Sequence, residues 1–139
     1  MWNFLGSSPA IEVRMRNTLL GETYPRNGGV MAVLDTGYSG FLLLPTKIFR
    51  ALRLDELMSR KSVAWLADGM KIEMKGAVGS IEIAGLGRTL DGMIQTLEGA
   101  SEILIGMDGI RGLFVQLDCC NRKLYAESCE PSSSEQEGD

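Results

Sequence analysis

Alternation of apolar and polar residues along the chain predicts a mainly β protein. Residues Ala10–Arg16 have the two-residue period of a strand with one buried face. The apolar run Val30–Leu34 predicts a strand buried on both faces, and the connection between them, 17–29, is rich in Gly and Pro. Pro45 then opens a short helical pattern, whose expected apolar face consists of Ile48, Phe49, Ala51 and Leu52.

The second half of the chain predicts two hairpins and further strands. Asp68-Gly69 separates two strand-like runs, 62–66 and 70–83, which is a strong hairpin signal. A second turn at 84–87 leads to a returning strand over 88–97. The remaining expected strands are 102–105, 113–118 and 123–126, the last two joined by a turn near Asn121-Arg122.

Length and composition indicate one ordered domain. A chain of 139 residues with 45% hydrophobic content can bury one core, and it is too short for two ordinary domains. We expect an N-terminal arm over 1–9, a folded domain over 10–128 and a disordered acidic tail over 129–139. The tail is mostly Ser, Glu, Pro and Gly, and burial of its few apolar groups cannot offset its ordering entropy.

Charge and apolar run lengths exclude several classes of partner. The net charge is −4, the basic residues are scattered and aromatic residues are few, so nucleic acid is not an expected partner. Apolar runs are too short to cross a bilayer, and the first residues lack the pattern of a signal peptide, so we expect a cytoplasmic protein without a membrane partner. Three Cys, two of them adjacent, favour reduced thiols over a disulfide framework.

The chain contains no histidine. Ser-His-Asp and Cys-His hydrolase sites, His-containing zinc sites and His general bases are therefore excluded. Acid–base chemistry is left to carboxylates, to a perturbed Lys or Tyr, or to a metal held by oxygen ligands. Acidic residues do not show the spacing of a calcium loop, so we expect neither a metal nor a cofactor.

The triplet Asp35-Thr36-Gly37 is the most specific local feature. It places a carboxylate at the end of the apolar run 30–34, and Ser39 and a second apolar run, 41–44, follow it. A carboxylate in apolar surroundings needs a structural partner or has a chemical role. A second element, Leu104-Ile105-Gly106, occurs late in the chain.

Three segments together resemble the retropepsin-like aspartic proteases, above all their cellular single-domain relatives in bacteria and archaea. These segments are 33–45, 66–69 and 103–110, the last followed by Leu117-Asp118, and the resemblance runs from about Ile11 to Glu127. It implies a closed β-barrel, the acid-protease half-fold, with one or two short helices and a flap hairpin. It also implies a two-fold homodimer, because each chain carries one catalytic acid, Asp35.

The resemblance implies an aspartic endopeptidase that acts on peptide or protein substrates. Two Asp35 carboxylates share a proton across the dimer axis and activate a water, without metal or cofactor. Support of the active site is implied for Thr36, Gly37, Ser39, Leu104, Ile105 and Gly106. Substrate contacts in the flap and the pocket are implied for Tyr38, Trp65, Leu66, Ala67, Asp68 and Gly69.

The chain departs from viral members of that family at three positions. Viral members generally carry a small residue and then an acid after the triplet, with an Arg after the late Gly, where this chain has Tyr38, Ser39 and Met107. Side-chain preference therefore cannot be carried over from the viral enzymes. Asp108, which follows in the same segment, is interpreted as a helix cap or a loop brace.

Three other interpretations stay open at this point. The triplet can be an ordinary turn in which Asp35 accepts backbone hydrogen bonds. The protein can be a catalytically weak or inactive dimeric module of the same fold that binds extended peptide or a protein partner. A metal-dependent hydrolase using scattered carboxylates is the weakest of the three, since no second acid lies beside Asp35 in sequence.

Overall fold

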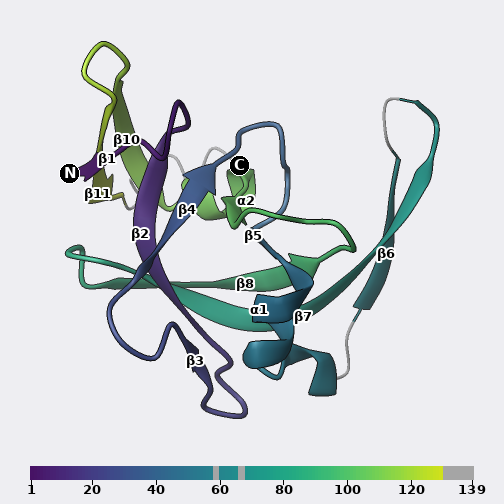
Figure 1. Ribbon diagram of the computed structural model, residues 1–139. Helices are drawn as coiled ribbons and strands as arrows, with labels where there is room; N and C mark the ends of the chain where they lie inside the picture. The colour runs from purple at the N-terminus through teal and green to yellow at the C-terminus, as the bar shows by residue number, and fades with distance from the viewer. Residues whose placement is uncertain (58–59, 66–67, 130–139) are drawn as a thin grey trace, which may run out of the picture.

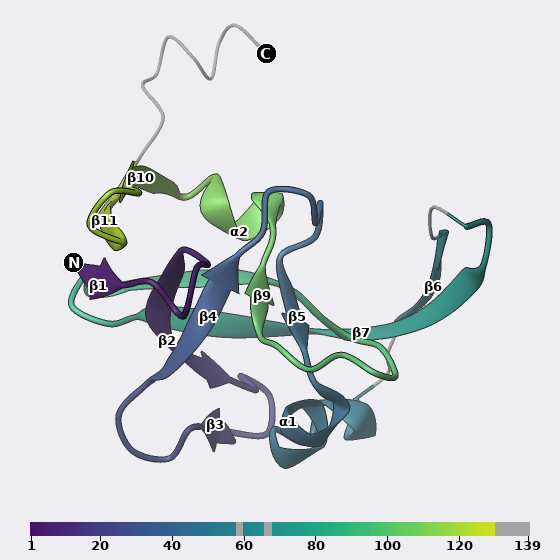
Figure 2. The same ribbon diagram turned by 45° about the horizontal axis from the view of Figure 1, so that its top comes forward.

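The computed structural model describes residues 1–57, 60–65 and 68–129. These residues form strands, two short α-helices and one 3-10 helix (Figures 1 and 2). The strands are β1 Trp2–Asn3, β2 Ala10–Arg16, β3 Thr23–Tyr24, β4 Val30–Leu34, β5 Leu42–Leu44, β6 Arg60–Trp65, β7 Lys71–Ile83, β8 Arg88–Thr96, β9 Leu104–Ile105, β10 Leu113–Asp118 and β11 Lys123–Ser128. The helices are α1 Thr46–Ala51, the 3-10 helix η1 Leu54–Glu56 and α2 Met107–Ile110.

Six strands close into a barrel. The larger sheet has the order β3-β2-β4-β9-β5-β8-β7-β6, and β2 also pairs with β7 along Val13–Arg16. This extra pairing joins β2, β4, β9, β5, β8 and β7 into a ring. Its interior holds apolar side chains that are shielded from solvent, among them Ile11, Val13, Met15, Leu42, Leu44, Ile81, Ile83, Ile94 and Ile105. The expected mainly β, closed-barrel fold with short helices is confirmed.

The long strand β7 belongs to two parts of the molecule. Its second half contributes Ala77, Ile81 and Ile83 to the buried core. Its first half pairs with β6 from Trp65↔Lys71 to Arg60↔Gly76, and this β6–β7 hairpin stands away from the barrel in both views (Figures 1 and 2). The expected hairpin around Asp68-Gly69 is therefore present.

A smaller sheet of order β1-β11-β10 packs beside the barrel. Trp2 pairs with Leu124, and the amide of Phe4 donates to the carbonyl of Arg122 at 2.9 Å. Leu124 is fully buried, and Trp2 and Phe4 are partly buried against the core. Residues of the expected arm 1–9 thus contribute a strand to this sheet.

Some element boundaries differ from the sequence-based prediction. The loop 17–29 contains β3, because Met15 and Arg16 find antiparallel partners in Tyr24 and Thr23. The strand expected over 102–105 is reduced to β9, Leu104–Ile105. In the predicted helix, Phe49 and Leu52 are buried as expected, whereas Ala51 is exposed and does not belong to its apolar face. Residues 130–139 of the expected tail lie outside the described residues.

Candidate functional site

Asp35 is the first residue of a tight loop, residues 35–41, that connects β4 to β5; we call it the Asp35 loop. Its amide donates to the carbonyl of Ile105 at 2.9 Å, and its carbonyl accepts from the amide of Tyr38 at 3.2 Å. The amide of Gly37 donates to Asp35 Oδ1 at 2.9 Å. The sequence led us to expect an acid enclosed by apolar residues, but within one chain Asp35 is half-buried, because the loop leaves the barrel and exposes Thr36 and Gly37.

Strand β9 lies between the two strands that flank this loop. It runs parallel to β4, with Leu34 opposite Ile105, and antiparallel to β5, with Leu42 also opposite Ile105. The amides that follow β9 then bind the loop's carbonyl groups: Gly106 donates to Phe41 at 3.1 Å, Met107 to Tyr38 at 2.8 Å and Asp108 to Gly40 at 3.1 Å. The late Leu104-Ile105-Gly106 element therefore holds the position of the Asp35 loop.

Gly106 is required by the closeness of the two segments. A β-carbon at this position would overlap the carbonyl oxygen of Gly40 and lie 2.5 Å from that of Tyr38. Its φ of −91° is accessible to any residue, so the requirement comes from contact and not from backbone conformation. Gly37 is less restricted, since its nearest neighbour would be Asp35 Oδ1 at 3.2 Å.

A cavity of about 670 Å³ lies beside the loop and under the β6–β7 hairpin; we call it the loop cavity. Several predicted residues line it together, namely Gly37, Tyr38, Ser39 and Leu104. The hairpin contributes Ser62, Val63 and Met74, and the rest of the lining is Gly40, Leu43, Gln95, Leu97 and Asp108. The loop that carries Asp35 and the hairpin thus face one space large enough for peptide side chains.

Not every predicted site residue lines this cavity. Ile105 is buried in the barrel, and Thr36 is exposed and makes no side-chain hydrogen bond within the described part of the chain. Asp68 and Gly69 are exposed in the hairpin turn, where Asp68 Oδ1 accepts from the amide of Met70 at 3.0 Å and Gly69 has a φ of +85°. Leu66 and Ala67 lie outside the described residues, and Trp65 is described through its backbone alone.

Tyr38 turns back against its own loop. Its hydroxyl donates to Gln95 Oε1 on β8, and its ring lies against Gly40 and Gly106. Burial, and secondarily the nearby Asp108 carboxylate, raise the pKa of Tyr38 to about 12. Sequence reasoning missed several residues of the loop cavity, among them Leu43, Met74, Gln95 and Leu97. The sequence shows which strand positions alternate between apolar and polar, but it does not show which face of the closed barrel lies against the Asp35 loop.

A pH titration tests this environment of Tyr38. The chain has three Tyr, and we expect one phenol to ionise near pH 12, detected by ultraviolet absorbance of the phenolate and absent in Tyr38→Phe. Because the folded pKa lies above the unfolded value, the stability that Tyr38 contributes is present below pH 10 and is lost as pH rises towards 12. A phenol that ionises near pH 10.0 in the wild type and is missing from Tyr38→Phe would contradict the observed packing of Tyr38.

Asp108 lies in the first turn of α2. The residue that caps this helix is Gly106, without a side-chain hydrogen bond, so the expected capping role of the Asp108 side chain is wrong. Asp108 Oδ1 instead forms an ion pair with Arg111 Nη1 at 3.3 Å. The Asp108 backbone amide donates a hydrogen bond to the carbonyl of Gly40. The loop-bracing half of the interpretation is correct, through the backbone.

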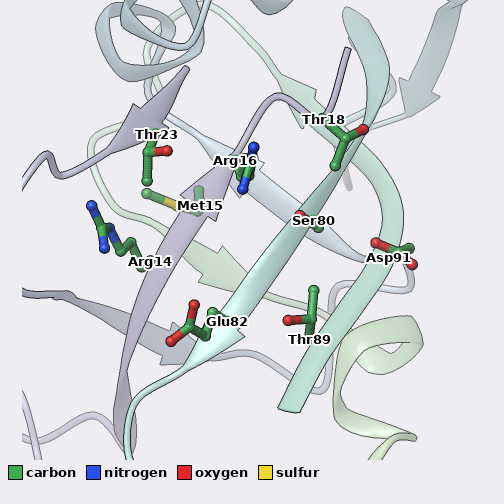
Figure 3. A pocket seen from close by; sticks show the side chains of 9 residues that line it. All are labelled: Arg14, Met15, Arg16, Thr18, Thr23, Ser80, Glu82, Thr89 and Asp91. Carbon is green, nitrogen blue, oxygen red and sulfur yellow. The ribbon is translucent and has the colours of Figure 1, made fainter. Parts of the chain in front are cut away.

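A second hollow, of about 540 Å³, is lined by residues of β2, β3, β7 and β8 and by none of the Asp35 loop (Figure 3). Its lining consists of basic and acidic side chains, hydroxyl side chains and one methionine: Arg14, Met15, Arg16, Thr18, Thr23, Ser80, Glu82, Thr89 and Asp91. The Arg14 guanidinium donates hydrogen bonds to the carbonyl groups of Pro25 and Arg26. The remaining charged residues, Arg16 on β2, Glu82 on β7 and Asp91 on β8, are exposed, as on a solvated sheet face.

Over 1–57, 60–65 and 68–129, no three Cys, Asp or Glu side chains gather closely enough to hold a metal ion. In that part of the chain no helix has both the length and the apolar character needed to cross a membrane.

Known proteins were compared with the chain at the levels of sequence and structure. The chain is 39% identical over 126 residues to an uncharacterized protein of Archaeoglobus fulgidus, a match that covers 91% of this chain and 98% of the relative. No model of a known protein family matches the sequence.

Solved structures show the same architecture. A retropepsin-like aspartic protease from Rickettsia conorii matches with a TM-score of 0.60 and 16% identity, over 89% of this chain and 92% of the other. The EIAV protease, solved in complex with an inhibitor, matches with a TM-score of 0.53 and 18% identity, over 80% of this chain and 91% of the other. The chain therefore has the fold of the retropepsin-like aspartic proteases and belongs to one family with the Archaeoglobus protein.

Proposed function

We propose that the protein is an aspartic endopeptidase whose active site forms when two copies bring their Asp35 side chains together. The observation that carries this proposal is the Asp35 loop. One carboxylate oxygen is held by the Gly37 amide, the side chain remains half-exposed, and the loop lines a cavity of about 670 Å³ together with the β6–β7 hairpin. The two neighbours of this fold that bear a protease name support the same assignment.

The proposed reaction needs two carboxyl groups and one water. An ionised Asp35 takes a proton from the water as the water oxygen bonds to the scissile carbonyl carbon, and the protonated Asp35 of the other copy donates its proton to the carbonyl oxygen. The tetrahedral intermediate then collapses: the carboxyl group that took the water proton gives it to the departing amine nitrogen, and the other carboxylate takes a proton from a hydroxyl group of the intermediate as the carbonyl re-forms. The chemistry requires no histidine, in agreement with a chain that contains none.

The hairpin fits the part of a flap. Val63 is 57% exposed and Met70 is 61% exposed, and Val63 lines the loop cavity. An extended peptide lying between the hairpin and the two acids would cover these apolar side chains and exclude water from the acids. In this proposal Ser39 and Leu104 line the channel, whereas Asp68 and Gly69 form the flap turn.

The small sheet offers a surface for the second copy. Within the described residues β10 pairs only with β11, so its other edge is unpaired. Phe114 on β10 is 58% exposed and Tyr125 on β11 is 42% exposed, on the same face of this sheet. Figure 2 shows α2 between the Asp35 loop and β10, so a two-fold axis near the loop would bring two β10 edges together.

A charged residue on this edge tests the assembly. Phe114→Lys is expected to raise the dimer dissociation constant at least about tenfold, because two ammonium groups would replace two apolar contacts near the axis. Sedimentation velocity measures the dissociation constant, and peptidase assays over a range of protein concentrations measure the dependence of activity on assembly. Leu19→Lys, at a loop residue that is 77% exposed, is the matched control. A monomer that cleaves peptide would contradict the shared site.

The peptidase activity itself is tested with a diverse peptide library at acidic to neutral pH. We expect internal cleavage that a statine-type transition-state mimic blocks. If peptides bind to the dimer and remain intact, the protein is instead the non-catalytic binding module of the same fold.

A further inference from the structure

Two cavities meet behind the Asp35 loop. The loop cavity, of about 670 Å³, shares Gly40, Gln95 and Asp108 with a neighbouring cavity of about 420 Å³. We call the neighbour the acidic cavity, because Asp91 and Asp108 are in its lining, which is completed by Gly40, Phe41, Gly92, Met93, Gln95 and Arg111. Tyr38 lines the loop cavity but not the acidic cavity.

Tyr38 and Gln95 stand at the boundary between them. The Tyr38 hydroxyl donates to Gln95 Oε1 and also lies 3.4 Å from the carbonyl oxygen of Leu42. Gly40 and Gly106 leave room for the Tyr38 ring, since a β-carbon on either glycine would overlap that side chain. The ring is thus packed against both glycines and anchored at its hydroxyl group, which makes it a fixed wall and not a freely rotating side chain.

The two sides of this wall differ in chemistry. On the side of the loop cavity, the apolar lining is supplied by Leu43, Val63, Met74, Leu97 and Leu104, and Asp108 belongs to the lining of both cavities. On the other side, the Asp108–Arg111 pair is more than half exposed and therefore weak, with side-chain exposures of 56% and 72%. Asp91 is exposed, also lines the hollow shown in Figure 3, and makes no ion pair among the described residues, so it contributes an unpaired carboxylate to the acidic cavity.

We propose that Tyr38 and Gln95 form the end wall of a substrate side-chain pocket and thereby determine its specificity. The pocket accepts apolar side chains of leucine size, and the wall separates long basic side chains from Asp91, the carboxylate that lines the acidic cavity and not the loop cavity. This inference rests on the proposed peptidase function. It assigns a role to Gln95 and Asp91, and it makes Tyr38 a specificity-determining residue for that reaction.

Removing the wall should change the preference in a defined direction. In Tyr38→Ala the two cavities merge, and a Lys or Arg side chain of a substrate can reach the Asp91 carboxylate. We expect the ratio of kcat/KM for a basic residue over Leu at the affected position to rise at least about tenfold. Tyr38→Phe keeps the ring and should change this ratio by less than about threefold, whereas Gln95→Ala should raise it without altering the loop.

Two further variants separate this explanation from a general loosening of the site. Adding Asp91→Asn to Tyr38→Ala should reverse most of the gain for basic side chains, because the unpaired carboxylate is lost. Tyr125→Ala, at a Tyr that is 42% exposed on the small sheet, is the control for loss of a tyrosine. Thermal unfolding of each variant identifies any that fail to fold, in which case Gln95→Ala carries the test.

The experiment distinguishes failure of the wall from failure of the proposed function. If wild type cleaves and Asp35→Asn does not, but neither Tyr38→Ala nor Gln95→Ala shifts the preference towards basic residues, the wall is wrong and the peptidase stands. If wild type cleaves no peptide, fluorescent Leu and Lys peptides titrated into the wild type and the Tyr38→Ala protein measure the same preference as a ratio of Kd values. An unchanged ratio, or no binding, overturns the inference.

Discussion

Asp35→Asn is expected to abolish peptide cleavage while the protein stays folded. The amide is nearly the same size as the carboxyl group, and its oxygen can still accept the hydrogen bond that the Gly37 amide donates to Asp35 Oδ1. Because Asp35 is half-exposed, the change creates no buried unpaired group. The substituted site, however, can neither take a proton from water nor donate one. We expect kcat to fall by roughly 10³-fold or more, and the free energy of unfolding to change by less than about 0.5 kcal/mol.

Mixing the Asp35→Asn protein with wild type tests whether two copies share one active site. If each active unit needs two Asp35 side chains, mixed dimers are inactive, and activity falls with the square of the wild-type fraction at constant total protein. Asp55→Asn, at an exposed acid in η1, is the matched control and should follow the wild type. A linear fall in activity on mixing, or an Asp35→Asn protein that cleaves like its parent, would falsify the proposed dyad.

Gly106→Ala is expected to cause the largest loss of stability at the site. The added β-carbon would overlap the Gly40 carbonyl and lie 2.5 Å from the Tyr38 carbonyl, and both are backbone groups that cannot rotate away. The segments must separate, which breaks the hydrogen bonds from Met107 and Asp108 to the loop. We expect the free energy of unfolding to fall by about 3 kcal/mol, as measured by urea denaturation, and cleavage to be lost with the position of Asp35.

The appropriate control is another glycine beside the same helix. At Gly112 a β-carbon would first meet Leu90 Cδ2 at 3.0 Å, the flexible end of a side chain that can move aside. Gly112→Ala should therefore cost less than about 1 kcal/mol. Equal costs for the two substitutions would mean that close approach of the backbone at Gly106 is not what positions the Asp35 loop.

The parts of the fold that could be predicted from sequence are those that depend on local pattern. The period of Ala10–Arg16 and the apolar run Val30–Leu34 correspond to β2 and β4 without change. Asp68-Gly69 identified the β6–β7 hairpin because Gly69 takes up the left-handed conformation that such a turn requires. The triplet that begins at Asp35 indicated where the site lies, since it follows a buried strand.

The remaining features depend on contacts between distant segments. Strand β9 has two residues, too few for a period, and it is a strand only because β4 and β5 bind it from both sides. The wall between the two cavities joins Tyr38 to Gln95, and the closure of the barrel decides that Gln95 faces the loop. Trp2–Asn3 is likewise a strand only because β11 provides a partner. No local propensity encodes any of these pairings.

Because the Asp35 loop is held by β9 and the residues after it, it can become ordered only after they have been synthesised. Asp35 leaves the ribosome before the residues that fix its loop, Ile105 to Asp108, which follow only after β6, β7 and β8 have been made. Contacts between such distant segments form late, because closing a long loop costs entropy before its contacts are gained. A nascent chain therefore carries the acid without the scaffold that orients it, and the site becomes ordered only after nearly the whole barrel has been synthesised.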